Sequence, residues 1–347
     1  MIDNLLNPWI KDLVPYSSAR SEFSGKAEIL LDANESWEGG NDGINRYPDP
    51  LAKELRREIE RVMGIPYEMS AIGNGSDEVI DMLIRMFCCP GRDSIMIERP
   101  TYGTYSVFAS TSNVSVIDVP LTPDLDLDEE AMMEAIVRKK PKIVFICSPN
   151  NPTGRVYPLE KIVRIAEINE GITAVDEAYA DFALNFESAI SYIKKNPRIV
   201  VLRTFSKAYG KAGARLGILV SDPEIQKVFM KAKPPYNVSS PAEKAGLDAL
   251  SEYDEAMERV RETIARRNEL TAFLQTLPYV VRVFPSEANF VLVRVSDAAA
   301  LYSYLLEMGI VVRNRSSDLL LENTLRITIG SEMEMEKLKE ALNGWNG

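Results

Sequence analysis

Continuous apolar runs mark the central part of the chain. Residues 143–147, 172–175 and 199–202 are almost entirely apolar and do not alternate with polar residues. This pattern is typical of strands that are buried on both faces of a parallel sheet. Further strands are predicted at 94–97, 114–119 and 215–221, and helices are predicted at 51–59 and 128–139, where apolar residues recur at helical spacing. The pattern therefore predicts an α/β fold with a mainly parallel sheet between helices.

A proline-rich segment at 234–241 is the clearest boundary signal in the chain. A long helical stretch from Ala242 to Leu277 follows it and leads into a smaller α+β domain. Strands of this domain are predicted at 280–284, 289–295, 310–313 and 325–329, and helices at 297–308 and 332–342. We therefore divide the chain into an N-terminal arm that contributes to the small domain, a large domain and a small C-terminal domain, at 1–44, 45–236 and 237–347.

Composition narrows the class of function. The 347 residues are 46% hydrophobic and 26% charged, and the net charge is −11. Nucleic acids and anionic membranes select basic surfaces, so neither is an expected partner. No apolar run reaches the length of a membrane-spanning helix, and the first residues do not resemble a signal peptide, so we expect a cytoplasmic protein.

The chain contains no histidine. This absence removes the commonest metal ligand and the usual general base, so we expect no metal site and consider lysine the leading candidate for proton transfer. The three cysteines, Cys88, Cys89 and Cys147, form no metal-binding or disulfide pattern.

A lysine-containing loop follows the apolar run 199–202. Lys207 lies among small residues and hydroxyls, and Arg215 follows eight positions later. A nearby cation favours the neutral, nucleophilic form of an amine, which is the form that Schiff-base chemistry requires. Thr204, Ser206 and Arg215 could together bind a phosphate. The alternative is a surface loop with solvated lysines, and Lys211 is the weaker candidate for the reactive amine.

Three other segments carry candidate binding residues. Gly75, Ser76 and Asp77 open a helix, where free N–H groups favour an anion, although a simple helix cap is the alternative. Asn151 and Asp176 follow the apolar runs 143–147 and 172–175, at the edge where open α/β sheets bind ligands. A carboxylate buried there needs a partner, and a cationic group of a ligand is a suitable one.

Several motifs occur together in one order. They are Pro-Tyr-x-Ser-Ala-Arg at 15–20, Leu-Asp-Ala-Asn-Glu at 31–35, Arg-Tyr-Pro-Asp-Pro at 46–50, Pro-Thr-Tyr-Gly at 100–103, Asn-Pro-Thr-Gly at 151–154, Asp-Glu-Ala-Tyr at 176–179, Ser-Lys-Ala at 206–208 and Leu-Arg-Ile-Thr-Ile-Gly at 325–330. Together they resemble the histidinol-phosphate aminotransferase family. The resemblance implies a fold-type I pyridoxal-phosphate-dependent transferase with a seven-stranded sheet in its large domain.

The resemblance also implies roles for individual residues. Lys207 would form the Schiff base with pyridoxal 5'-phosphate and carry the proton, Asp176 would hold the ring nitrogen, and Asn151 and Tyr179 would bind the phenolic oxygen. The residues implied around the cofactor phosphate and ring are Gly75, Ser76, Asp77, Tyr102, Thr204, Ser206 and Arg215, with Tyr47 reaching across a homodimer interface. The residues implied at the substrate are Tyr16, Asn34, Asn151, Arg313 and Arg326. Arg315 has no match and is expected to be exposed, and Tyr105 is expected to serve in the core or at an interface.

The function implied is transfer of an amino group from histidinol phosphate to 2-oxoglutarate, a step of histidine biosynthesis, with ping-pong kinetics. Two alternatives remain open: an aromatic or broad-specificity amino-acid aminotransferase, and a threonine-phosphate decarboxylase. A non-enzymatic regulator is disfavoured because the chain retains Lys207 and has no basic patch.

Overall fold

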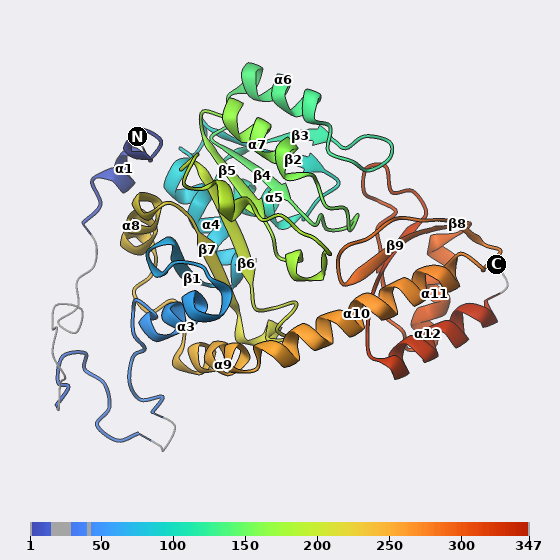
Figure 1. Cartoon of the computed structure of the whole chain (residues 1–347). Helices are drawn as coiled ribbons and strands as arrows, with labels where there is room; N and C mark the ends of the chain where they lie inside the picture. Colours follow the sequence, from blue (N-terminus) through green and yellow to red (C-terminus); the bar gives the residue numbers. More distant parts are fainter. Residues whose placement is uncertain (1, 15–28, 40–42, 346–347) are drawn as a thin grey trace.

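The computed structural model describes residues 2–14, 29–39 and 43–345, and it contains two sheets. Figure 1 shows them at opposite ends of the long helix α10. The first sheet has seven strands in the order β1-β7-β6-β5-β4-β2-β3. Its strands are β1 (Ser70–Asn74), β2 (Ser94–Arg99), β3 (Ser115–Pro120), β4 (Ile143–Cys147), β5 (Ile172–Asp176), β6 (Ile199–Thr204) and β7 (Leu216–Val220).

The pairing confirms the predicted mainly parallel sheet. Strands β3, β2, β4, β5 and β6 pair in parallel, whereas β7 runs antiparallel to both β6 and β1. The carboxyl ends of the parallel strands therefore meet at one edge, and that edge receives the residues that follow β4, β5 and β6. Strand β1, which the sequence pattern did not reveal, ends at this same edge, where α4 begins.

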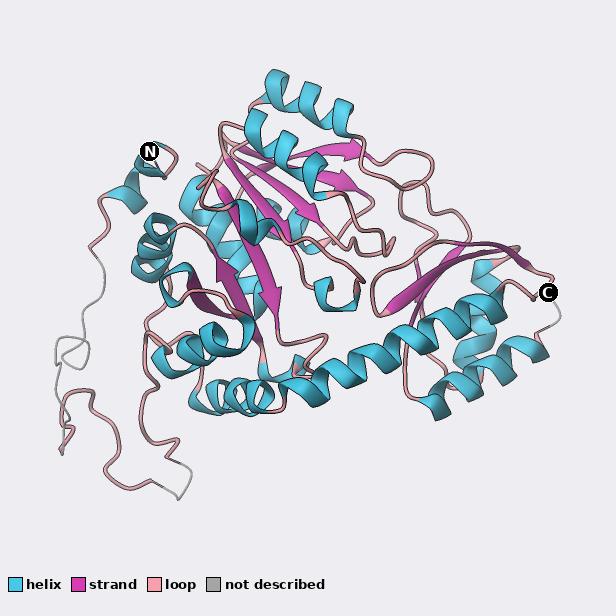
Figure 2. Cartoon of the chain, viewed as in Figure 1, coloured by secondary structure: helices cyan, strands magenta, loops and turns pink. Residues whose placement is uncertain are grey.

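Two hydrophobic cores cover the two faces of this sheet. In β4, Val144 and Ile146 face one core and Ile143, Phe145 and Cys147 face the other, so both faces are buried as predicted. The first core also takes side chains of α3 (Lys53–Met63), α6 (Glu129–Lys139), α7 (Leu159–Ile168) and α9 (Ser240–Ser251). The second takes those of α4 (Gly75–Phe87), α5 (Thr104–Thr111) and α8 (Pro223–Ala232). Figure 2 shows this helix–sheet–helix layering.

The second sheet has four antiparallel strands in the order β10-β11-β9-β8. They are β8 (Val280–Val283), β9 (Phe290–Val295), β10 (Arg313–Asn314) and β11 (Thr324–Thr328). Helices α11 (Ala298–Glu307) and α12 (Glu332–Gly344) and the end of α10 (Tyr253–Leu274) complete a third hydrophobic core with this sheet. The small α+β domain is confirmed.

Two predicted elements of this region were wrong in extent. The helix predicted over 242–277 is two helices, α9 and α10, which meet at Glu252. The break lets α9 bury Leu250 in a core of the large sheet, while the far end of α10 buries Leu270 in the core of the small one. The strand predicted at 310–313 pairs only at residues 313–314, because Ile310 still closes the last turn of α11 through its bond to Leu305.

The first residues lie against the large sheet's helix α4. Ile2 belongs to the core that contains α4, and the Asn7 side chain donates hydrogen bonds of 2.6 Å to the carbonyl oxygens of Arg85 and Cys88. The domain boundaries at residues 44 and 236 stay predictions. Within the described residues, none of the helices is long and apolar enough to cross a membrane.

Gly217 permits a close approach between β7 and the start of α4. A Cβ atom added at Gly217 would lie 2.3 Å from the Ser76 nitrogen and 2.4 Å from the Gly75 carbonyl carbon. Both are backbone atoms, so a side chain could be accommodated only by moving the helix start. The absence of a side chain at residue 217 therefore allows the first turn of α4 to lie this close to β7.

We expect Gly217→Ala to lower the free energy of unfolding by about 1–3 kcal/mol, because the added methyl group overpacks the α4 start. Thermal or urea unfolding followed by circular dichroism measures this change. The control is Gly213→Ala, since a Cβ there meets nothing within 4 Å. Equal stability of the two variants would contradict the close-approach argument.

Candidate active site

A cavity of about 540 Å³ opens at the carboxyl edge of the large sheet. It gathers twelve of the residues that the sequence singled out: Ser76, Asp77, Tyr102, Asn151, Asp176, Tyr179, Thr204, Ser206, Lys207, Arg215, Arg313 and Arg326. Residues that the sequence interpretation did not place there also line it: Gly103, Thr104, Val107, Cys147, Ala178, Ala212 and Arg315. The cavity thus combines ends of β4, β5 and β6 with the start of α4 and arginines from β10 and β11.

Lys207 lies in the loop after β6 with its amine in the cavity. The residue is exposed to the cavity that it lines, and its nitrogen lies 5.4 Å from the ring centroid of Tyr179. Partial desolvation by the surrounding protein lowers the pKa of Lys207, and the positive charges of Arg326 and Arg215 lower it further, whereas Asp176 and Asp77 oppose the shift. The environment therefore favours the neutral amine, which can act as a nucleophile or base.

Asp176 forms the floor of the cavity at the end of β5. Only 3% of the residue is exposed, and its carboxylate accepts hydrogen bonds from the Tyr105 hydroxyl at 2.6 Å and the Ala178 N–H at 3.1 Å. Burial raises the pKa of Asp176, while these hydrogen bonds act in the opposite direction. Because both donors are neutral, the buried carboxylate is well placed to bind a cationic group of a ligand.

The first turn of α4 and Arg215 form a cup for an anion. The helix has no side-chain cap, and Gly75 adopts a φ of +75° directly beside the Arg215 guanidinium. Asp77 holds this cup together: its carboxylate accepts from Arg215 at 3.1 Å and from the Tyr102 hydroxyl at 3.0 Å. Free helix N–H groups and a guanidinium together favour a phosphate or similar anion.

A second group of cations lies at the small-domain wall. Arg326 donates a 2.5 Å hydrogen bond to the Asn151 side chain, which in turn lies 3.4 Å from the Tyr179 hydroxyl. Arg313 is directly opposite Arg326 in the register of β10 and β11. Like charges placed opposite each other repel, so this wall is suited to an anionic ligand.

Arg315 was expected to be exposed, and this prediction was wrong. Its side chain is only 17% exposed, forms an ion pair of 2.5 Å with Asp318 and lines the cavity. The hydrogen bond from the Asp318 N–H to the Arg315 carbonyl oxygen forms a turn directly after β10, and this turn directs residue 315 inward. The alternation Arg-x-Arg at 313–315 was the available signal, because residues two apart in an extended segment share a face.

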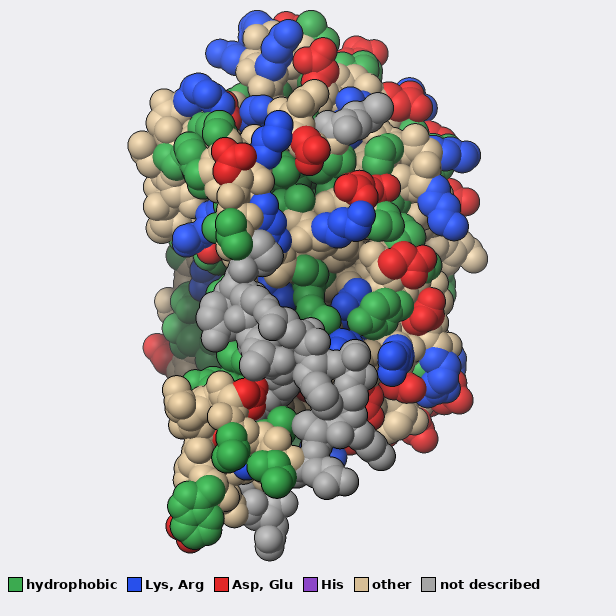
Figure 3. All heavy atoms as spheres, turned by 90° about the vertical axis from the view of Figure 1, so that its left-hand side faces the viewer, with side chains coloured by type: hydrophobic (Ala, Val, Ile, Leu, Met, Phe, Trp, Pro, Cys, Tyr) green, Lys and Arg blue, Asp and Glu red, His purple; other side chains and the backbone are tan. Residues whose placement is uncertain are grey.

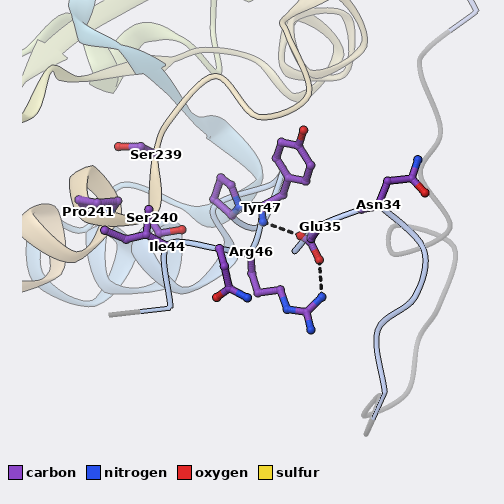
Figure 4. A pocket seen from close by; sticks show the side chains of 11 residues that line it. Asn34, Glu35, Ile44, Arg46, Tyr47, Ser239, Ser240 and Pro241 are labelled. Atoms are coloured by element: carbon purple, nitrogen blue, oxygen red, sulfur yellow. Dashed lines mark hydrogen bonds and ion pairs between the residues drawn. The ribbon is translucent and has the colours of Figure 1, made fainter. Parts of the chain in front are cut away.

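Two predicted residues lie away from the cavity. Asn34 and Tyr47 line a separate pocket of about 300 Å³, where Figure 4 shows the Glu35 carboxylate between Arg46 and the backbone of Tyr47. The ring of Tyr47 stacks on Tyr236 with 4.4 Å between centroids. Tyr16 lies outside the described residues.

Comparisons with known proteins agree on one family. The family model described as aminotransferase class I and II matches residues 21–344. The chain is 43% identical to the histidinol-phosphate aminotransferase of Cytophaga hutchinsonii over 343 residues, and 41% identical to that of Bacteroides fragilis over 342 residues. Each alignment covers 98% of both chains.

Solved structures agree with the sequence relatives. The histidinol-phosphate aminotransferase of Sinorhizobium meliloti in complex with pyridoxal-5'-phosphate matches 89% of this chain and 88% of its own, with 26% identity and a TM-score of 0.78. That of Clostridium acetobutylicum matches 87% and 90%, also with 26% identity and a TM-score of 0.78. The predicted fold class, fold type I, is confirmed.

We expect Arg326→Gln to raise the pKa of Lys207, because the variant removes a positive charge that disfavours the ammonium form. At any fixed pH, a smaller fraction of the amine is then neutral. An amine-selective reagent should therefore modify Lys207 more slowly at pH 8 in the cofactor-free variant than in the wild type, as followed by mass spectrometry of the Lys207 peptide.

The matched control is Arg294→Gln. Arg294 lies on β9 and donates to the carbonyl oxygens of Glu322 and Leu320, away from Lys207. An unchanged labelling rate in Arg326→Gln, or equal changes in both variants, would show that the charge of Arg326 does not control this amine.

Proposed function

The chain belongs to the aminotransferase class I and II family, and on this premise we propose that it uses pyridoxal 5'-phosphate to transfer the amino group of histidinol phosphate to 2-oxoglutarate. One observation carries the proposal: the amine of Lys207 lies between two separate anion sites, the cup at Arg215 and the wall at Arg326. One site suits the phosphate of the cofactor and the other suits an anionic group of the substrate.

The donor set fits pyridoxal phosphate. The uncapped start of α4, Arg215 and the hydroxyl of Ser206 would hold the phosphate. Thr204 would position Ser206, because its hydroxyl donates to the Leu216 carbonyl oxygen and accepts from the Ser206 N–H. Asp176, a buried carboxylate whose hydrogen-bond donors are neutral, would bind the protonated ring nitrogen. When bound, pyridoxal phosphate supplies a carbonyl that captures amines and a ring that accepts the electrons released at the substrate carbon.

The chain's own residues would orient the substrate and move its proton. The Nζ atom of Lys207, biased toward its neutral form, would take the proton from the substrate carbon and return a proton later in the cycle. Arg326 would bind the anionic group of the substrate while its hydrogen bond to Asn151 fixes the guanidinium plane. Tyr179 keeps its proton because burial raises its pKa, so its hydroxyl can donate a hydrogen bond.

The arginine wall supports a phosphate-bearing donor. Three guanidinium groups, those of Arg313, Arg315 and Arg326, line one side of the cavity, and Asp318 pairs with Arg315. Guanidinium groups bind phosphate through paired hydrogen bonds. The curated relatives at 41–43% identity bear the name of an enzyme that acts on such a substrate.

A homodimer with shared active sites is part of the same proposal. Several apolar side chains on the N-terminal arm face solvent in the single chain, among them Leu31 at 91% and Trp37 at 86% exposure. Figure 3 shows the face that carries the described parts of the arm, residues 2–14 and 29–39, and hydrophobic side chains are exposed on this face. Such an apolar surface is typical of an interface. We propose that Tyr47 completes the cavity of a partner subunit, and that the enzyme acts in the cytoplasm.

We expect histidinol phosphate alone, without any keto acid, to remove the visible absorbance of the yellow holoenzyme, because one half-reaction consumes the carbonyl form of the cofactor. Chromatography of the extracted cofactor should then show its aminated form. Lys207→Ala should bind pyridoxal phosphate and lack this conversion. A yellow protein that does not respond to histidinol phosphate would refute this donor, and release of carbon dioxide from threonine phosphate would favour the decarboxylase alternative.

We expect a mixture of the inactive variants Lys207→Ala and Tyr47→Ala to regain activity after the subunits exchange. Random pairing makes about half of the dimers mixed, each with one intact site, so about a quarter of wild-type activity should return. The control mixes Lys207→Ala with Asp176→Ala, whose changes fall in the same subunit's cavity and should not complement. Equal activity of both mixtures would contradict a shared site.

A further inference from the structure

A buried tyrosine lies beneath the floor of the cavity. Tyr105, in the first turn of α5, is 0% exposed, and its hydroxyl donates the 2.6 Å hydrogen bond to Asp176. Its ring stacks on Phe145 with 4.8 Å between centroids and meets the edge of Tyr102 at 5.5 Å. These contacts hold the ring in place, so the hydroxyl can hardly rotate away from the carboxylate.

A second carboxyl group lies close to this pair. Glu98, on β2, is buried, and its Oε1 atom accepts hydrogen bonds from the Cys147 N–H at 2.8 Å and the Thr101 hydroxyl at 3.0 Å. Its Oε2 atom has no hydrogen-bond partner. Cys147 lies on β4, between the two acid-bearing strands, and pairs in register with Asp176.

Two neighbouring buried carboxyl groups compete for one negative charge. Burial together with the charge of Asp176 raises the pKa of Glu98 to about 7. Burial also raises the pKa of Asp176, so burial alone does not decide which acid is ionised. The hydrogen bond from Tyr105 favours the charged form of Asp176, and burial keeps the pKa of Tyr105 so high that the hydroxyl remains a donor.

The other titratable groups around Asp176 do not replace this hydrogen bond. Asp77 raises the pKa of Asp176, while Lys207 lowers it and is itself biased toward the neutral amine. Cys147, Tyr102 and Tyr179 are neutral, because burial raises the pKa of each of them.

We propose that Tyr105 is a positioning residue that keeps the negative charge on Asp176 and off Glu98, so that Asp176 is ionised and oriented toward the cavity. The inference rests on the proposed function, in which Asp176 binds the protonated ring nitrogen of pyridoxal phosphate. Tyr105 itself acts only through Asp176. The chain contains no histidine that could serve as this donor.

The test compares Tyr105→Phe with the wild type in the binding of pyridoxal phosphate to the cofactor-free protein. A hydrogen bond to a charged group is lost, so we expect the Kd to rise about tenfold or more. The loss raises the pKa of Asp176, and binding should therefore begin to fail at a higher pH than in the wild type as the solution is acidified. The ¹⁵N resonance of the ring nitrogen in the bound cofactor should move toward its unprotonated position.

Tyr279→Phe is the matched control for a merely structural role. Tyr279 is buried in the small domain, and its hydroxyl donates an equally short hydrogen bond of 2.6 Å to the Leu342 carbonyl oxygen. Both variants should lose stability, but only Tyr105→Phe should change the Kd, its pH dependence and the ¹⁵N resonance. A Tyr105→Phe variant that differs from the wild type only in stability would overturn the proposal.

Glu98→Gln tests whether Tyr105 acts by placing the negative charge on Asp176 or only by packing. Alone it should leave the Kd unchanged below pH 7, because Glu98, with a pKa of about 7, is mostly protonated there. Added to Tyr105→Phe, it should restore part of the lost affinity, because Asp176 is then the only acid of the pair. No restoration, or a loss of affinity in Glu98→Gln alone, would contradict the competition between the two acids.

Infrared spectroscopy keeps the proposal testable if Tyr105→Phe does not fold. The difference between wild type and Glu98→Gln below pH 7 should contain the C=O band of one protonated carboxyl group, and a carboxylate band in its place would overturn the proposal. A wild-type protein that binds no pyridoxal phosphate would instead refute the proposed function, so the two failures are distinguishable.

Discussion

A carboxylate buried at the end of a central strand constrains everything around it. Asp176 can remain charged there only if donors and cations stabilise it, because burial by itself favours the protonated acid. The Tyr105 hydroxyl and the Ala178 N–H provide part of this stabilisation. The cavity above the carboxylate is open for a cationic ligand atom to provide the rest. The strand order places Lys207, from the next strand β6, on the other side of that space.

The same edge explains why much of the site could be predicted from the sequence. Asn151, Asp176 and Lys207 each follow an almost entirely apolar run, and parallel strands bring the ends of such runs together. The start of α4 lies beside these residues because β1 ends at the same edge of the sheet. The hydropathy pattern of the short segment 70–74 did not predict this strand. Pattern therefore identified the strand-end residues, while the family motifs suggested what each could do.

What the sequence left unresolved depends on contacts between distant segments. The pattern at 100–105 gives no sign that Tyr105 reaches a carboxylate 71 positions away. Arg315 is turned inward by a turn at residues 315–318, which hydropathy does not reveal. The helix break at Glu252 lets the residues before it pack in a core of the large sheet and the far end of α10 pack in the core of the small sheet. Tyr47 and Asn34 lie apart from the cavity of their own chain, so a single chain gives no information on their predicted roles.

The cavity lining is positively charged, whereas the whole molecule carries a negative net charge. The chain carries a net charge of −11, yet the cavity lining holds four guanidinium groups, those of Arg215, Arg313, Arg315 and Arg326, besides the Lys207 amine, and two carboxylates, Asp77 and Asp176. A cleft with low-dielectric walls concentrates its local field, so small anions are attracted there although the outer surface repels them. Large polyanions meet the acidic exterior first. A small doubly charged substrate enters the cavity and experiences mainly the positive field of its walls. The cavity therefore favours small phosphorylated and carboxylated molecules over large polyanions before any specific contact forms.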